Sequence, residues 1–173
     1  MIPALLPGRE DRAGEAPAKS FDEVIGPLCN ELLGMVEVGE EYLLAGHSMG
    51  GGLAFEVARE LRRRGAEMPV GLIVSSCRSP EGRKSAAKVD ARAAESDVIL
   101  DADQKMFGAH QYAAEAPLRI PITTMMESEE LGRGWELETD HAFRSVLVEG
   151  GHFWLLTQAE LMAAEMKRLF SVT

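Results

Sequence analysis

Short apolar runs recur along the chain, and glycine, proline or charged residues bound each of them. The runs are continuous rather than alternating, which is typical of strands in a parallel sheet that is covered on both faces. The sequence therefore predicts five strands, at residues 4–6, 42–45, 70–74, 122–126 and 145–148.

Segments with apolar residues at helical spacing separate several of these strands. Ser20 and Glu23 form a capping-box pattern before one helix, and Thr157 and Glu160 form another before the last helix. A further helix is predicted over residues 51–64. This alternation predicts an α/β fold with a mostly parallel sheet flanked by helices. Its functional residues should gather at the carboxyl ends of the strands.

The length of 173 residues suits one domain with its own core. Residues 79–103 break the alternation, since they are rich in alanine, serine and charge and have little periodicity. We interpret them as a shortened, lid-like helical insertion rather than a linker. The prediction is a single domain over residues 1–173.

The charge of the chain argues against several kinds of partner. It has 28 acidic and 18 basic side chains, a net charge of −10, and one short arginine run at residues 62–64. Nucleic acid is therefore not an expected partner. No stretch approaches the roughly 18 apolar residues of a membrane span, and no signal-peptide pattern is present. We expect a soluble, cytoplasmic protein without a membrane partner.

The cysteines and histidines are too scattered for a metal site. Cys29 and Cys77 fit neither a disulfide framework nor a C-x-x-C motif, and the histidines lack zinc-site spacing. We expect two reduced core thiols and no metal.

The strongest chemical signal is the sequence Gly-His-Ser-Met-Gly at residues 46–50. It is a G-x-S-x-G motif with a predicted strand before it and a predicted helix after it. On such a turn the serine takes a strained backbone conformation and its hydroxyl is presented above the sheet. We predict that Ser48 is a nucleophile. The alternative is a glycine-rich turn that serves only close packing of helix on strand.

A serine nucleophile needs a base, and His152 follows Gly150-Gly151 directly after the last predicted strand. A histidine on this loop can reach across the sheet edge to the serine, so we predict that His152 is the base. For His110 and His141 we prefer a loop histidine whose ring is satisfied by water. His47 is interpreted as packing or turn support that points away from the site.

The third member of such a site is a carboxylate that orients the histidine. The run Glu127-Ser128-Glu129-Glu130 follows the strand at residues 122–126, in the place where the chain order serine, acid, histidine puts it. We choose Glu130, with Glu129 as the next candidate. The alternative is a solvated acidic loop.

Several segments together resemble type II thioesterases, the free-standing α/β-hydrolase enzymes that edit nonribosomal peptide and polyketide assembly lines. They cover most of the chain apart from residues 79–98. The resemblance rests on residues 6–12 (Leu-Pro-Gly-Arg-Glu-Asp-Arg), 46–50, 55–59 (Phe-Glu-Val-Ala-Arg) and 150–153 (Gly-Gly-His-Phe).

The resemblance implies hydrolysis of acyl groups from the phosphopantetheine arm of an acyl or peptidyl carrier protein, with no cofactor. Ser48 would form an acyl-enzyme, His152 would act as base and then acid, and Met49 would supply an oxyanion-hole N–H.

The chain also departs from the family pattern. The resemblance implies that the family's opening strand, one oxyanion loop and most of the lid are missing, which would attenuate activity. The strand at residues 4–6 would then close against residues 42–45, or self-association or an upstream segment would complete the sheet.

Two alternatives to an editing thioesterase stay open at this point. One is a catalytically impaired remnant of the fold that binds a carrier protein or acts as a scaffold. The other is a small-molecule esterase, which the same motif allows.

Overall fold

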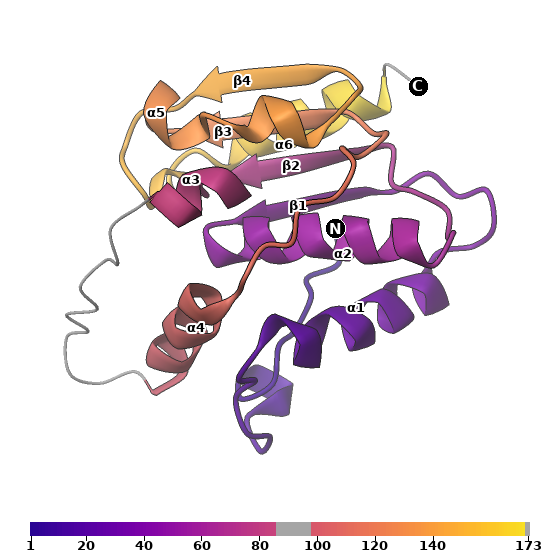
Figure 1. The fold of residues 1–173 in the computed structure, drawn as a ribbon, viewed down its shortest axis with the longest axis vertical. Coiled ribbons are helices and arrows are strands. Elements are labelled where there is room, and N and C mark those ends of the chain that lie inside the picture. Colours follow the sequence, from indigo (N-terminus) through magenta and orange to yellow (C-terminus); the bar gives the residue numbers. More distant parts are fainter. Residues whose placement is uncertain (86–97, 172–173) are drawn as a thin grey trace.

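The protein is described by a computed structural model over residues 1–85 and 98–171. Within these ranges it forms one four-stranded sheet in the order β1-β2-β3-β4, and all neighbouring strands are parallel (Figure 1). The predicted fold class, a mostly parallel sheet flanked by helices, is confirmed. The strands are β1 (Leu43–His47), β2 (Gly71–Ser75), β3 (Ile122–Met126) and β4 (Phe143–Leu147).

Helices connect the strands and cover the sheet. The longer ones are α1 (Phe21–Met35), α2 (Met49–Arg63), α4 (Val98–Ala109) and α6 (Ala159–Phe170). The shorter ones are η1 (Glu10–Arg12), α3 (Pro80–Ser85), α5 (Glu129–Gly132), η2 (Trp135–Glu138) and η3 (Trp154–Leu156). Both ends of the predicted insertion are thus helical, and its middle lies outside the described residues.

The two faces of the sheet are buried by different helices. Leu72 and Val74 of β2 pack with Phe55 of α2, whereas Ile73 between them packs with Leu169 of α6. This alternation follows from the two-residue period of a strand. Figure 1 shows α2 on one face with α1 outside it, and α6 on the other face. Burial on both faces explains why the apolar runs of the sequence are continuous.

The parallel pairing brings the carboxyl ends of the strands to one edge of the sheet. His47 of β1 lies opposite Ser75 of β2, and Ser75 lies opposite Met125 of β3. In Figure 1 the strand arrows all point to this edge, and the chain that leaves β4 passes along it. Residues that follow the four strands can therefore meet there.

Two predicted elements are wrong. Residues 4–6 form no strand, so they do not close against β1. Pro3 and Pro7 flank this short run, and Leu6 packs instead in a cluster with Phe21.

The second wrong element is the capping box before the last helix, since α6 begins at Ala159 after Gln158. The Thr157 hydroxyl donates instead to the carbonyl of Trp154 and so closes the preceding 3-10 turn.

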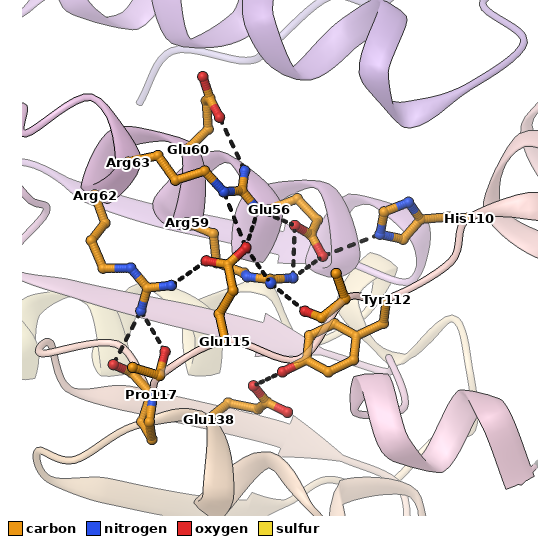
Figure 2. A network of polar contacts seen from close by, with 12 residues as sticks. Glu56, Arg59, Glu60, Arg62, Arg63, His110, Tyr112, Glu115, Pro117 and Glu138 are labelled. Carbon is orange, nitrogen blue, oxygen red and sulfur yellow. Dashed lines mark hydrogen bonds and ion pairs between the residues drawn. The ribbon is translucent and has the colours of Figure 1, made fainter.

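A polar network ties the segment after α4 to the outer side of α2 (Figure 2). Arg59 is 3% exposed and contacts Glu56 on its own helix and Glu115 across from it. His110 also contacts Glu56, at 3.1 Å between Nε2 and Oε1, and its ring stacks on Phe21. The prediction of a water-satisfied His110 is therefore wrong, because protein groups hold its ring on both its edge and its face.

Burial raises the pKa of Glu56, but the hydrogen bond from His110 and the charge of Arg59 outweigh it, and the net pKa lies below its ordinary value. Glu138 at the edge of the network has a raised pKa, mainly because of burial. Burial, with the bond to Glu138, also raises the pKa of Tyr112 to about 12.

Within residues 1–85 and 98–171, no helix combines the length and the apolar character that crossing a bilayer requires.

Candidate active site

Ser48 sits on the sharp turn between β1 and α2. Its φ is +54° and its ψ is −124°, a strained conformation for a residue other than glycine. The turn is tight, since a Cβ at Gly46 would lie 2.0 Å from the carbonyl oxygen of Gly50. The Ser48 N–H donates to the Ser75 carbonyl at 2.8 Å, which anchors the turn to β2. The motif therefore has the strand, turn and helix context that presents its hydroxyl at the sheet edge.

His152 lies on the loop between β4 and η3. Gly150 and Gly151 before it have φ values of +106° and +71°, which other residues adopt only with strain. The Trp154 N–H donates to the Gly151 carbonyl at 3.0 Å and closes a turn with His152 inside it.

The structure brings Ser48 and His152 together although 104 positions separate them. The His152 Nε2 and the Ser48 Oγ are 3.0 Å apart, at hydrogen-bond distance. The His152 side chain is 46% exposed, so the pair opens to solvent. This contact allows the ring to accept the serine proton.

The carboxylate beside His152 belongs to Glu127 and not to Glu130. The Glu127 Oε1 lies 3.6 Å from the His152 Nδ1, and the Glu127 side chain is 18% exposed. Its other oxygen is buried and, among the described residues, has no hydrogen-bond partner.

The choice of Glu130 is corrected because Ser128 caps α5 directly after Glu127. The helix carries Glu129 and Glu130 into solvent, where both are exposed.

His47 lies beside His152, with ring centroids 5.2 Å apart, rather than pointing away from the site. Its Nδ1 is 2.9 Å from the Ser75 Oγ. Burial and the nearby charge of His152 lower the pKa of His47, and a hydrogen bond to the His152 backbone partly opposes them. The lowered pKa favours the neutral form of the His47 ring.

Met49 is the first residue of α2, so its N–H has no acceptor within the helix. It follows Ser48 directly in the chain. A free N–H at this place can donate to an oxygen that gains negative charge beside the serine.

Sequence reasoning missed three groups at this edge. Glu127 was part of the acidic run but was passed over, although it is the first carboxylate after β3. Ser75 is the last residue of β2 and Ser76 follows it, and both are buried. Two hydroxyl residues in succession after an apolar strand were the available signal.

The family model described as "Thioesterase domain" matches residues 1–107. The gramicidin S biosynthesis protein GrsT of Aneurinibacillus migulanus is 26% identical over 181 residues, which cover 87% of this chain and 70% of that protein.

Solved structures of thioesterases are also similar. RedJ, the thioesterase of the prodiginine pathway in Streptomyces coelicolor, has a TM-score of 0.81 and 27% identity over 96% of this chain and 74% of RedJ. YbtT, a type II thioesterase of a yersiniabactin pathway, has a TM-score of 0.80 and 27% identity over 96% of this chain and 80% of YbtT.

The sheet, the strained serine turn and these neighbours place the chain in the class of α/β-hydrolase folds. Within that class, the chain belongs to the thioesterase family, and its relatives are type II thioesterases of nonribosomal peptide and polyketide pathways. The resemblance inferred from residues 6–12, 46–50 and 150–153 is thus confirmed.

Proposed function

We propose that the protein is a serine thioesterase that hydrolyses acyl groups from phosphopantetheine thioesters on acyl or peptidyl carrier proteins. Its role is editing, the removal of unwanted acyl groups in nonribosomal peptide or polyketide biosynthesis. The observation that carries the proposal is the 3.0 Å contact between the Ser48 Oγ and the His152 Nε2 at a strained turn of a thioesterase-family chain.

In the proposed reaction the Ser48 oxygen attacks the thioester carbonyl while the His152 Nε2 takes its proton. The tetrahedral intermediate collapses as the C–S bond breaks, and His152 returns the proton to the departing thiolate. Water then attacks the acyl-serine in the same way, which frees the acid and restores Ser48. The Met49 N–H supports the oxyanion in both halves.

Glu127 is the proposed orienting carboxylate. At 3.6 Å its oxygen lies beyond a good hydrogen bond to the His152 Nδ1, but within reach of an ion pair once the ring is protonated. Catalytic contacts of this kind often tighten when substrate binds. A glutamate can therefore fill the role that aspartate has in other serine hydrolases.

A serine-directed fluorophosphonate probe tests the nucleophile. We expect the probe to label Ser48, and labelling to be lost in Ser48→Ala and strongly slowed in His152→Ala. Labelling that is absent from the intact protein, or unchanged in His152→Ala, would instead support the non-catalytic remnant.

Substrate class needs a second measurement. We expect acyl-pantetheine thioesters, free or on a carrier protein, to be hydrolysed faster than oxygen esters of the same acyl group. A preference for the oxygen esters would favour a small-molecule esterase and contradict the thioesterase function.

We also propose self-association at β1 as the partner interaction that completes the sheet. Among the described residues β1 pairs only with β2, so its outer edge is free, and Ala45 in its middle is exposed. Free strand edges bind other strands readily. Size-exclusion chromatography with light scattering should show a dimer that Ala45→Lys dissociates, and a monomer at all concentrations would contradict this part.

A further inference from the structure

Ser48 and His152 come from opposite edges of the sheet. Two strands lie between β1 and β4, so three strand spacings, or roughly 14 Å, separate them. The loop that carries His152 must therefore cross the carboxyl ends of β3 and β2 to reach Ser48. At the end of β2 this path meets two hydroxyl groups in succession, those of Ser75 and Ser76.

Ser76 contacts the far end of the His152 turn. Its Oγ accepts a hydrogen bond from the Trp154 Nε1 at 3.1 Å, and both residues are buried. The backbone N–H of Trp154 also closes the turn by donating to the Gly151 carbonyl. Holding the Trp154 indole in place therefore holds the turn that contains His152.

Ser75 is linked to the same turn through His47. Its hydroxyl lies 2.9 Å from the His47 Nδ1, and the His47 ring lies next to the His152 ring. Its carbonyl also accepts the Ser48 N–H, so one fully buried residue is hydrogen-bonded to the Ser48 backbone and linked to His152 through the His47 ring.

The backbone of Ser76 is itself strained. Its φ is +47°, in the left-handed region that glycine adopts more easily than any other residue. A glycine would relieve the strain but would have no hydroxyl for Trp154. Strain retained beside a reacting pair is a reason to look for a role of the side chain.

We propose that Ser75 and Ser76 are positioning residues that hold His152 over Ser48, Ser76 through Trp154 and Ser75 through His47. The proposal rests on the function proposed above, in which His152 is the base for Ser48. The two hydroxyls touch neither substrate nor the reacting atoms, and they act on the geometry of the pair.

The first test compares Ser76→Ala, Ser76→Gly and Trp154→Phe by the rate of Ser48 labelling with the fluorophosphonate. We expect each to slow labelling about 10-fold, since a small displacement of a catalytic group has effects of this order or more. Combining Ser76→Ala with Trp154→Phe should slow it no further, because both remove the same bond.

Ser76→Gly separates positioning from stability. It should unfold at higher urea than Ser76→Ala, because it relieves the positive φ, and yet label as slowly. In turnover of an acyl-pantetheine thioester, both variants should lower kcat with little change in KM. Labelling at the intact rate in Ser76→Gly, or multiplied losses in the double variant, would overturn the role of Ser76.

The matched control is Ser79→Ala. Ser79 is also fully buried, and its hydroxyl donates to the Arg133 carbonyl at 2.8 Å and accepts from the Gly82 N–H at 3.0 Å. This variant should label within about twofold of the intact rate, whereas Ser75→Ala should label about threefold slower. An equal loss in Ser79→Ala would mean that any buried hydroxyl has the same effect, which contradicts the proposal.

A measurement independent of activity keeps this proposal separate from the function. In NMR spectra of the intact protein, Ser48→Ala should shift the ring signals of His152, because it removes the bond at Nε2. The shift should vanish when Ser76→Gly is already present and shrink with Ser75→Ala. If the probe fails to label Ser48 but these couplings hold, the proposed reaction is wrong and the positioning stands. If the full shift persists in both backgrounds, the positioning is wrong.

Discussion

Two histidine–carboxylate pairs occupy different regions of this molecule. His110 and Glu56 meet at 3.1 Å on the outer side of α2, with side chains 15% and 5% exposed. His152 and Glu127 meet at 3.6 Å at the carboxyl edge of the sheet, with side chains 46% and 18% exposed. The buried pair is the shorter one, yet its position does not suit it to catalysis.

The difference lies in what surrounds each pair. The Glu56 carboxylate also binds Arg59, and the His110 ring stacks on Phe21, so these groups are used in holding the segment after α4 (Figure 2). His152 has one ring nitrogen toward a carboxylate and the other toward the Ser48 hydroxyl.

Cavity size does not identify the proposed active site either. A cavity of about 300 Å³ lies beside His110, and neither Ser48 nor His152 lines it. The proposed active site is distinguished by the Ser48 hydroxyl, which lies at hydrogen-bond distance from the second ring nitrogen of His152.

The sharpest test of this contrast removes one group from each region. Ser48→Ala and His152→Ala should each lower kcat/KM on an acyl-pantetheine thioester by about 10⁴-fold or more, because serine and histidine act as one unit. His110→Ala should leave kcat/KM within about twofold of the intact value while it lowers stability. Steady-state kinetics decides, and an equal loss in His110→Ala would erase the distinction between the pairs.

Arg59→Ala tests the structural region by stability. Removing a side chain that is 3% exposed takes away the buried arginine that Glu56 and Glu115 share, so we expect the unfolding free energy to fall by about 3 kcal/mol. Arg144→Ala is the matched control, since Arg144 is 49% exposed in its pair with Glu165 and should cost less than about 0.5 kcal/mol. Urea unfolding measures both, and similar losses would contradict the assigned role.

Glu127→Gln and Glu130→Gln decide which carboxylate serves His152. The first change keeps the shape but removes the charge beside the ring, so kcat should fall about 10²-fold, or roughly 2.7 kcal/mol. Glu130 is exposed on α5, and its change should stay within about twofold. The reverse order in kinetic measurements would restore the choice made from the sequence.

The smallest expected effect is the pH dependence of the stability that the polar network contributes. A carboxyl whose folded pKa is lowered stabilises the fold above its unfolded pKa, and that contribution is lost as pH falls through the folded pKa. Glu56 behaves in this way, so in a series from pH 7 to about pH 3 the urea midpoints should fall below the ordinary pKa of 4.5, and less steeply in Glu56→Gln.

Glu138 has a raised pKa and should act in the opposite sense, so Glu138→Gln should steepen the acid loss. Equal slopes in all three proteins would contradict these assignments.

Most of the framework could be predicted because it depends on local patterns. The run Ile122–Met126 is a strand with the predicted bounds, and the Ser20 hydroxyl caps α1 as its spacing with Glu23 indicated. The run at residues 4–6 failed as a strand because three residues between prolines carry too little information about their partner. Leu6 is buried as its apolar character suggests, but against α1 rather than in the sheet.

The candidate site likewise contains residues that local patterns identify and residues that only long-range contacts identify. Ser48 was identified from a motif whose strain and glycine requirement are local. Choosing among Glu127, Glu129 and Glu130 required knowing that α5 begins after Ser128 and turns the last two away. The roles inferred for Ser75 and Ser76 needed still more, because their contacts reach residues 28 and 78 positions away.

The sequence by itself therefore determined the α/β class, the strained serine and the family, since these follow from periodicity and from short motifs. Only the tertiary structure decided which carboxylate meets His152, which hydroxyls support its loop, and that His110 belongs to a buried ionic network. These are contacts between distant segments, and they depend on strand order and helix starts that no local pattern contains.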